Sequence, residues 1–206
     1  MAIKSLSSSS LANNVFYRSL LVGNDPFIPF IAADDLLAEV TLTSSASSVS
    51  FTGLGAYSDY KHLQLRMVTR FDTSSNDMNY LTFNGDNGSN YSTHRLEASL
   101  STSTVNSASH VSEAYIRIAE TDKSSNASGA FGAAVIDILD FSDTNKNTTV
   151  RLLSGHTGAG NTTDGVALRS GLWDSTAAVT SIELNVAIAA WFSLVAGSRF
   201  SLVGIR

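Results

Sequence analysis

From about Ala38 onward, apolar and polar residues alternate in short stretches that are separated by Gly, Asn, Asp and Ser. The stretch Tyr60–Arg70 is the clearest case, because Leu63, Leu65 and Met67 alternate with polar residues. A period of two is typical of a β-strand with one buried and one solvated face. The pattern predicts about ten or eleven strands, at residues 38–43, 47–52, 60–70, 79–83, 91–100, 111–119, 131–141, 148–153, 166–173, 180–191 and 198–205.

Strands at this spacing, without intervening helices, predict an all-β antiparallel protein, a sandwich or a barrel. The Ser- and Thr-rich residues 101–109 and the polar residues 155–165 are predicted as loops. Residues 84–90 contain Asn-Gly twice, which favours a tight hairpin. The same residues are rich in oxygen, but they lack the spacing and the terminal Glu of a calcium loop.

Residues 1–37 have a different character. Both prolines of the chain, Pro26 and Pro29, lie here and fix extended backbone. The segment is too apolar for an ordinary disordered tail, so it is predicted to be a docking arm that lies on its own domain or on a partner. Residues 38–206 form the predicted sandwich domain. The candidate protein-contact residues of the arm are Phe16, Tyr17, Phe27, Ile28 and Phe30.

The composition supports the all-β prediction and excludes several chemistries. Only 15% of the residues are charged, and the polarity comes mainly from 33 Ser, 18 Thr and 14 Asn, which favour strands, caps and turns over helix surfaces. Without cysteine there is no disulfide or thiolate metal site. The net charge of −5 argues against nucleic acid as a partner. No stretch has the length of a transmembrane or secretory segment, so no membrane partner is expected.

The sequence predicts no catalytic, metal-binding or cofactor-binding residue. The four histidines, His62, His94, His110 and His156, have no metal-ligand spacing between them. No G-x-S-x-G motif is present, so a hydrolase is not favoured. The chain is therefore expected not to be an enzyme and to need no cofactor.

Three other features receive structural interpretations. Asp137 and Asp140 lie three residues apart in a predicted strand, which places them on opposite faces rather than as an acid and base pair. Asp140 and Asp143 are expected to bond the backbone of a turn. Trp173 and Trp191 could line a sugar site, but their apolar neighbours favour burial.

Several segments resemble small virion structural proteins of tailed bacteriophages, a group frequent among phages of aquatic bacteria. They are MAIKSLSSSSL at the start, YKHLQLRMVTRF (60–71), LTFNGDNGSNYSTHRL (81–96), IDILDFSDTNKNTTVRLLSG (136–155), SGLW followed by AVTSIEL, and the closing GSRFSLVGIR. The resemblance implies a β-sandwich, jelly-roll-like, on the exterior of a virion that is made in the host cytoplasm. It carries over no catalytic residue.

Within that class two roles compete. The first is a capsid decoration (cement) protein, whose arm binds the major capsid protein or other virion proteins. The second is a tail-associated fibre or receptor-binding module, in which the loops at 84–90 and 155–165 bind a host glycan. An enzyme such as a depolymerase is a third possibility only within the tail role. A homo-oligomer, a trimer, is expected by analogy with exterior phage modules.

Overall fold

The computed structural model describes residues 34–74, 78–99, 103–157, 165–186 and 192–206. These residues form two antiparallel sheets, so the predicted all-β sandwich is confirmed. The eight-stranded sheet has, in spatial order, β1 (Asp34–Thr41), β12 (Arg199–Ile205), β3 (His62–Thr69), β8 (Gly132–Leu139), β9 (Thr148–His156), β10 (Gly165–Trp173), β5 (Tyr91–Ser99) and β6 (Thr104–Glu113). The four-stranded sheet has β2 (Ser48–Thr52), β11 (Ser181–Asn185), β4 (Met78–Phe83) and β7 (Ile116–Glu120).

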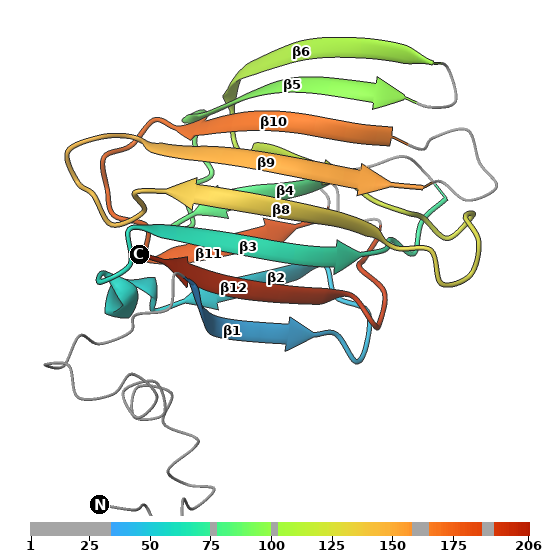
Figure 1. Cartoon of the computed structure of the whole chain (residues 1–206), viewed down its shortest axis with the longest axis horizontal. Coiled ribbons are helices and arrows are strands. Elements are labelled where there is room, and N and C mark those ends of the chain that lie inside the picture. Colours follow the sequence, from blue (N-terminus) through green and yellow to red (C-terminus); the bar gives the residue numbers. More distant parts are fainter. Residues whose placement is uncertain (1–33, 75–77, 100–102, 158–164, 187–191) are drawn as a thin grey trace, which may run out of the picture. The chain divides into compact units, whose positions relative to one another are not determined.

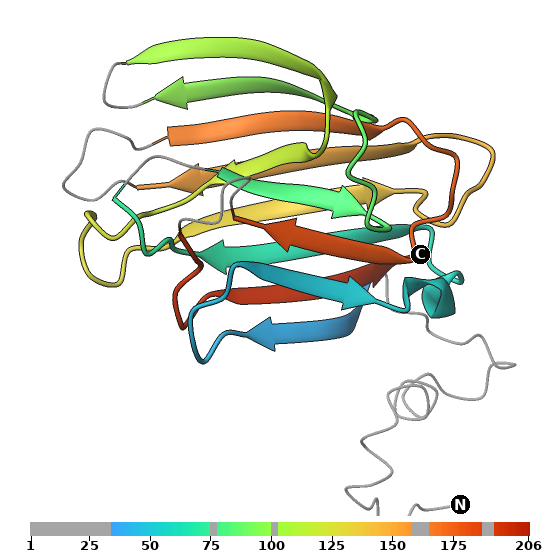
Figure 2. The same cartoon turned by 180° about the vertical axis from the view of Figure 1, so that it is seen from behind.

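The two sheets lie face to face. Figure 1 views the outer face of the eight-stranded sheet. Figure 2 views the molecule from the opposite side, with the four-stranded sheet in front. Their inner faces enclose the core. Leu63, Leu65 and Met67 are at most 2% exposed, which confirms the alternation predicted for β3. They share the core with residues of the opposite sheet such as Leu81 and Ile182.

The sheets differ in width because two hairpins extend only one of them. β5 with β6 and β9 with β10 are hairpins that both join the eight-stranded sheet. The outermost strand of the smaller sheet, β7, packs against β9, β10 and β5. Strand β6 therefore lies past the edge of the smaller sheet (Figure 2), although its Glu113 side chain bonds Arg117 of β7. One short 3₁₀ helix spans Leu54–Tyr57, and no helix among the described residues has the length and apolarity to cross a membrane.

The loop predicted at residues 101–109 is wrong for residues 104–109, which belong to β6. Its residues are mostly polar and exposed, so no apolar alternation marks the strand. Backbone pairing with β5 forms it instead, an example of tertiary context overriding local pattern. The single strand predicted at 111–119 is also wrong. Ser112 has a φ of 55°, and the chain crosses here from β6 in one sheet to β7 in the other.

The hairpin predicted at 84–90 is wrong as well. The tight turn itself is present, because Asn84 and Gly85 have φ values of 54° and 69° and the Asp86 amide donates to the Phe83 carbonyl at 2.9 Å. The strands on either side of the loop do not pair with each other, since β4 and β5 belong to different sheets. The loop at 84–90 therefore carries the chain from the smaller sheet to the larger one, and we call it the arch. The first strand also starts earlier than predicted, at Asp34 rather than Ala38.

We predict that Gly171 fixes the distance between the sheets. A Cβ at this position of β10 would lie 2.7 Å from Cγ2 of Ile116 in β7, which is completely buried. Gly171→Ala should lower the free energy of unfolding in urea by about 1–3 kcal/mol, through overpacking. Gly55→Ala is the matched control, because nothing lies within 4 Å of its Cβ position. Equal stability of the two variants would contradict the prediction.

Candidate functional site

The five predicted contact residues of the arm, Phe16, Tyr17, Phe27, Ile28 and Phe30, lie outside the described residues. So does Trp191. The candidate sites among the described residues therefore all belong to the sandwich. They are the loop at 84–90, the polar residues around β5 and β6, and the outer face of the eight-stranded sheet.

The loop at 84–90 is organised by the side chains of Asn84 and Asp86. The Asn84 Oδ1 accepts hydrogen bonds from the backbone amides of Thr180 and Ser181 at 2.8 and 3.1 Å, which ties the turn to the start of β11. The Asn84 Nδ2 donates to the carbonyl of Ala178 at 2.8 Å. The tip of the loop is exposed to solvent but anchored at its base.

The carboxylate of Asp86 is fully engaged within the fold. It accepts hydrogen bonds from Nε1 of Trp173 at 2.7 Å, Nδ2 of Asn90 at 2.9 Å and the amide of Gly88 at 2.8 Å. The bond from Trp173, with those from Asn90 and Gly88, holds the pKa of Asp86 below its ordinary value. Trp173 is 2% exposed, so its predicted burial is confirmed. The one carboxylate of this loop thus has protein partners.

The other candidate carboxylates lie in separate networks. Asp137 accepts hydrogen bonds from Nε2 of Gln64 and from Nη2 of Arg151, both at 2.8 Å. Asp140 pairs with Nζ of Lys146 at 2.7 Å. Turn bonding is confirmed at Asp143, whose Oδ1 accepts the amide of Asn145 at 2.8 Å. Within the described ranges, no group of three or more His, Asp or Glu residues could hold a metal ion.

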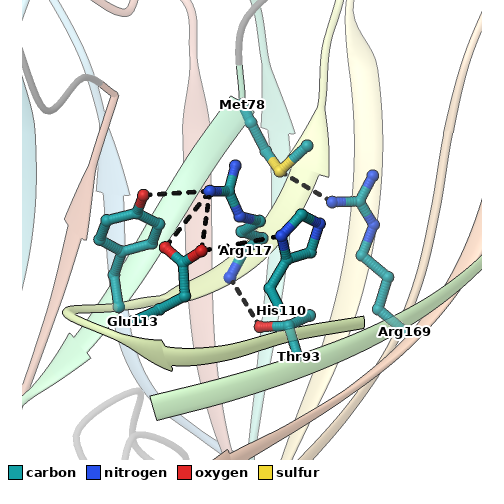
Figure 3. A network of polar contacts seen from close by, with 7 residues as sticks. Met78, Thr93, His110, Glu113, Arg117 and Arg169 are labelled. Carbon is teal, nitrogen blue, oxygen red and sulfur yellow. Dashed lines mark hydrogen bonds and ion pairs between the residues drawn. The ribbon is translucent and has the colours of Figure 1, made fainter. Parts of the chain in front are cut away.

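A polar network lies around β5, β6, β7 and β10 (Figure 3). Nη2 of Arg117 donates to Oε1 of Glu113 and to the hydroxyl of Tyr115, both at 3.2 Å. The Arg117 amide donates to Oγ1 of Thr93 at 3.2 Å. Nδ1 of His110 lies 3.7 Å from Oε1 of Glu113. Burial, together with the positive charge of Arg117, lowers the pKa of His110, so the neutral imidazole is favoured.

Arg169 is the most deeply buried charge of this network. Its side chain is 1% exposed, and Nη1 donates to the sulfur of Met78 at 2.8 Å (Figure 3). Its Nη2 lies 3.7 Å from carboxylate oxygens of both Glu97 and Glu120. Arg95 also pairs with Glu97, at 3.1 Å. The arginines are thus matched by glutamates, and the network neutralises itself across four strands.

This network could not be predicted from the sequence, because its members come from separate strands. Their spacing along the chain matches no motif, and only the pairing of β5 with β6 and β10 brings them together. One feature of the sequence does point to the network. Arg169 occupies an inward-facing position in β10, between Ala167 and Gly171, where a core residue is expected.

The outer face of the eight-stranded sheet carries two adjacent rows of uncharged side chains, which we call the apolar band. Members of each row are direct cross-strand neighbours. The first row consists of Val135, Leu153, Leu168 and Leu96, which are 41–53% exposed. The second row consists of Val68, Ala133, Gly155, Val166, Ala98 and Val105. The band crosses the sheet from β3 to β6 (Figure 1).

The two sheets present opposite kinds of surface. Among the described residues, every large hydrophobic residue with high exposure lies on the eight-stranded sheet: Leu36, Val68, Leu96, Val105, Val111, Val135, Leu153, Val166 and Leu168. The outward positions of β2 and β11 are instead Ser48, Ser50, Thr52, Ser181, Glu183 and Asn185. An exposed apolar patch of this kind marks a site of association.

A hollow adjoins the band near β1, β12, β3 and β8. Its walls include Leu36, Val68 and Val135, and its volume is about 500 Å³. The ion pair between Nε of Arg199 and Oε1 of Glu39, at 3.2 Å, lies at the same place. Leu36 stands at a bulge of β1, where the register with β12 shifts. The hollow therefore joins the apolar band to a charged region near the sheet edge, because Arg66 and the Arg199–Glu39 pair also line it.

Comparison with known proteins adds no relative: no protein-family model, no curated protein and no solved structure matches this chain.

We predict that Asp86 stabilises the arch between the sheets. Asp86→Asn should lower the free energy of unfolding at pH 7 by about 1.5–3 kcal/mol, because it weakens hydrogen bonds to a charged acceptor. Because the folded pKa of Asp86 is lowered, its contribution is complete above the unfolded pKa of about 3.9 and is lost as the pH falls through the folded pKa.

Urea titrations of both proteins between pH 7 and pH 3 test this prediction, and the difference between them should shrink with acid. Asp59→Asn, at an exposed position, serves as the control and should change stability by less than about 0.5 kcal/mol. A constant difference over this pH range would exclude the carboxylate as the cause.

Proposed function

We propose that this chain is a virion structural protein of a tailed bacteriophage, and within that class a capsid decoration (cement) protein without enzymatic activity. It binds the head exterior through its N-terminal arm and stabilises the shell by adhesion. The observation that carries the proposal is the apolar band on the outer face of the larger sheet, because exposed apolar surface of this extent is typical of proteins that associate. The resemblance of the sequence to phage virion proteins supplies the biological setting.

The topology supports the same class. We propose that the domain is a jelly roll enlarged by the β5–β6 and β9–β10 hairpins. Without these hairpins, the strand orders are β1-β12-β3-β8 and β2-β11-β4-β7. Successive strands then alternate between the two sheets, except for β4 and β7, which are neighbours in the smaller sheet. Eight strands in two such sheets are expected of a jelly roll, a fold used by viral capsid and lectin domains. This support is an analogy of fold.

The arm would provide the attachment to the capsid. Each of its large apolar residues, Phe16, Tyr17, Phe27, Ile28 and Phe30, would contribute roughly 1.5–3 kcal/mol if fully buried against a capsid subunit. Many copies on one shell would add multivalency to a weak single contact. The first 24 residues contain Lys4 and Arg18 and no acidic residue, which favours an acidic neighbour.

The alternative is a tail-associated fibre or receptor-binding module that recognises a host glycan. The observation in its favour is the loop at 84–90, whose tip exposes Asn87 and Ser89 above a base that Asn84 and Asp86 fix by hydrogen bonds. Amide groups held in place are suited to sugar hydroxyls. Trp173 would not take part by stacking, because it is buried.

Deleting residues 2–31 should abolish binding to phage particles and leave the sandwich folded, because β1 starts only at Asp34. Purified protein would be incubated with capsids that lack it, and bound protein would be measured after sedimentation, with circular dichroism as the test of folding. Deleting only Ser7–Ser10 is the matched control and should preserve binding. If the chain without residues 2–31 still decorates capsids normally, the arm is not the attachment.

The two candidate roles differ in copy number per particle. Quantitative electrophoresis of purified virions should give a high copy number for a cement protein and a low one for a tail fibre. A receptor-binding module should in addition adsorb to host cells or to purified surface polysaccharide, whereas a cement protein should not. Low copy number together with adsorption would replace the first role by the second.

A further inference from the structure

The two rows of the apolar band differ in side-chain size. Along β8, β9, β10 and β5 the first row has Val135, Leu153, Leu168 and Leu96. The second row has Ala133, Gly155, Val166 and Ala98 on the same four strands. Residues two apart on a strand are separated by about 6.6–6.8 Å. The face therefore has a ridge of large side chains beside a parallel trough of mostly small ones.

A ridge beside a trough is complementary to a copy of itself. We propose that a second copy of this chain packs its apolar band on this one, about a two-fold axis that runs along the band between the two rows. Rotation about this axis places each strand opposite the same strand of the partner subunit. It also places the ridge of each copy over the trough of the other. Leu153 then lies over Gly155 of the partner subunit, and Leu96 over Ala98 of the partner subunit. Val135 lies over Ala133 of the partner subunit in the same way.

The distribution of charge favours a second copy over a charged partner. The apolar band contains no charged residue, so two bands can meet without bringing like charges together. The row next to the first one, on the side away from the second row, contains Asp137 and Arg151. These two side chains already neutralise each other at 2.8 Å. Arg66, which continues the first row on β3 beside Val135, and the Arg199–Glu39 pair lie toward the β1 edge of the face, outside the band. The band itself thus offers no charge that would select an acidic or basic partner.

A two-fold dimer also needs only one kind of patch. Both subunits use the same surface in such a dimer, whereas a ring of three joins two different patches. Within the described ranges, all of the strongly exposed large hydrophobic residues lie on the eight-stranded sheet. This favours a dimer over the trimer that analogy with phage modules suggests.

The outer face of the eight-stranded sheet is large enough for a stable dimer interface. Its eight strands are seven to ten residues long, which corresponds to a face of about 34 by 27 Å, or roughly 900 Å². A stable interface buries about 800 Å² on each partner. Two sheets of this kind can pack with their strand directions within about 30° of each other. This inference goes beyond the proposed function. Both start from the apolar band, but here the sandwich forms the dimer, whereas the arm would attach the chain to the capsid.

Sedimentation equilibrium of the full chain tests the proposal. The wild-type protein should have twice the chain mass of 21.8 kDa. Leu153→Lys/Leu168→Lys should weaken self-association by about 100-fold or more, because it brings like charges together across the axis. Both side chains are about half exposed, at 52% and 53%, so the fold should remain intact by circular dichroism. Ser50→Lys/Thr52→Lys, on the outer face of the smaller sheet, is the control and should remain a dimer.

Mixing variants identifies the occupant of the band. Leu153→Glu/Leu168→Glu alone should be a monomer, and a mixture of the Lys and Glu variants should restore a dimer that contains one copy of each. If the arm of the chain occupied the band instead, this mixture would stay monomeric, and Phe27→Ser/Phe30→Ser would change the association. We expect Phe27→Ser/Phe30→Ser to leave the dimer unchanged.

Three results would overturn the proposal: a monomeric or trimeric wild-type protein, a Lys variant that dimerises normally, or a mixture that does not reassociate. Failure of this proposal is distinguishable from failure of the proposed function. The Lys variant should still bind capsids through its arm, and the chain without residues 2–31 should still dimerise if its sandwich remains folded.

Discussion

The structure depends on the burial of two sheet faces of unequal width. A sheet is stable in water when one face is covered by another apolar layer, and here four strands cover a sheet of eight. The core is formed where the sheets overlap, with Leu63, Leu65, Leu81 and Ile182 completely buried between them. The remaining surface of the larger sheet must be stabilised in another way.

On the inner face, the part near β5 and β6, at the edge of the smaller sheet, is polar. Arg117 and Glu113 bond each other there, and Arg169 lies between Glu97 and Glu120. Buried charges are tolerated when each has an opposite partner. The network thus takes the place of an apolar core between the edge strand β7 of the smaller sheet and strands β10, β5 and β6 of the larger one.

On the outer face, the same wide sheet exposes the apolar band, while the outward positions of β2 and β11 in the smaller sheet are all polar. Antiparallel sheets ordinarily keep one face polar, and only the smaller sheet follows this rule. The proposed adhesive function and the proposed dimer both follow from this difference, but they use separate parts of the chain. The arm would bind the capsid and the band would bind a second copy.

The sequence by itself determined the fold class and most strands, because an alternation such as that of Leu63, Leu65 and Met67 is a local consequence of strand geometry. It also determined the tight turn at Asn84 and Gly85. Only the tertiary structure decided that this turn starts an arch and that residues 104–113 form a strand, since strand partners are chosen by contacts distant in sequence. For the same reason the Arg169 network and the apolar band were not predicted: both consist of residues from several strands, which become neighbours only through the register of the sheet.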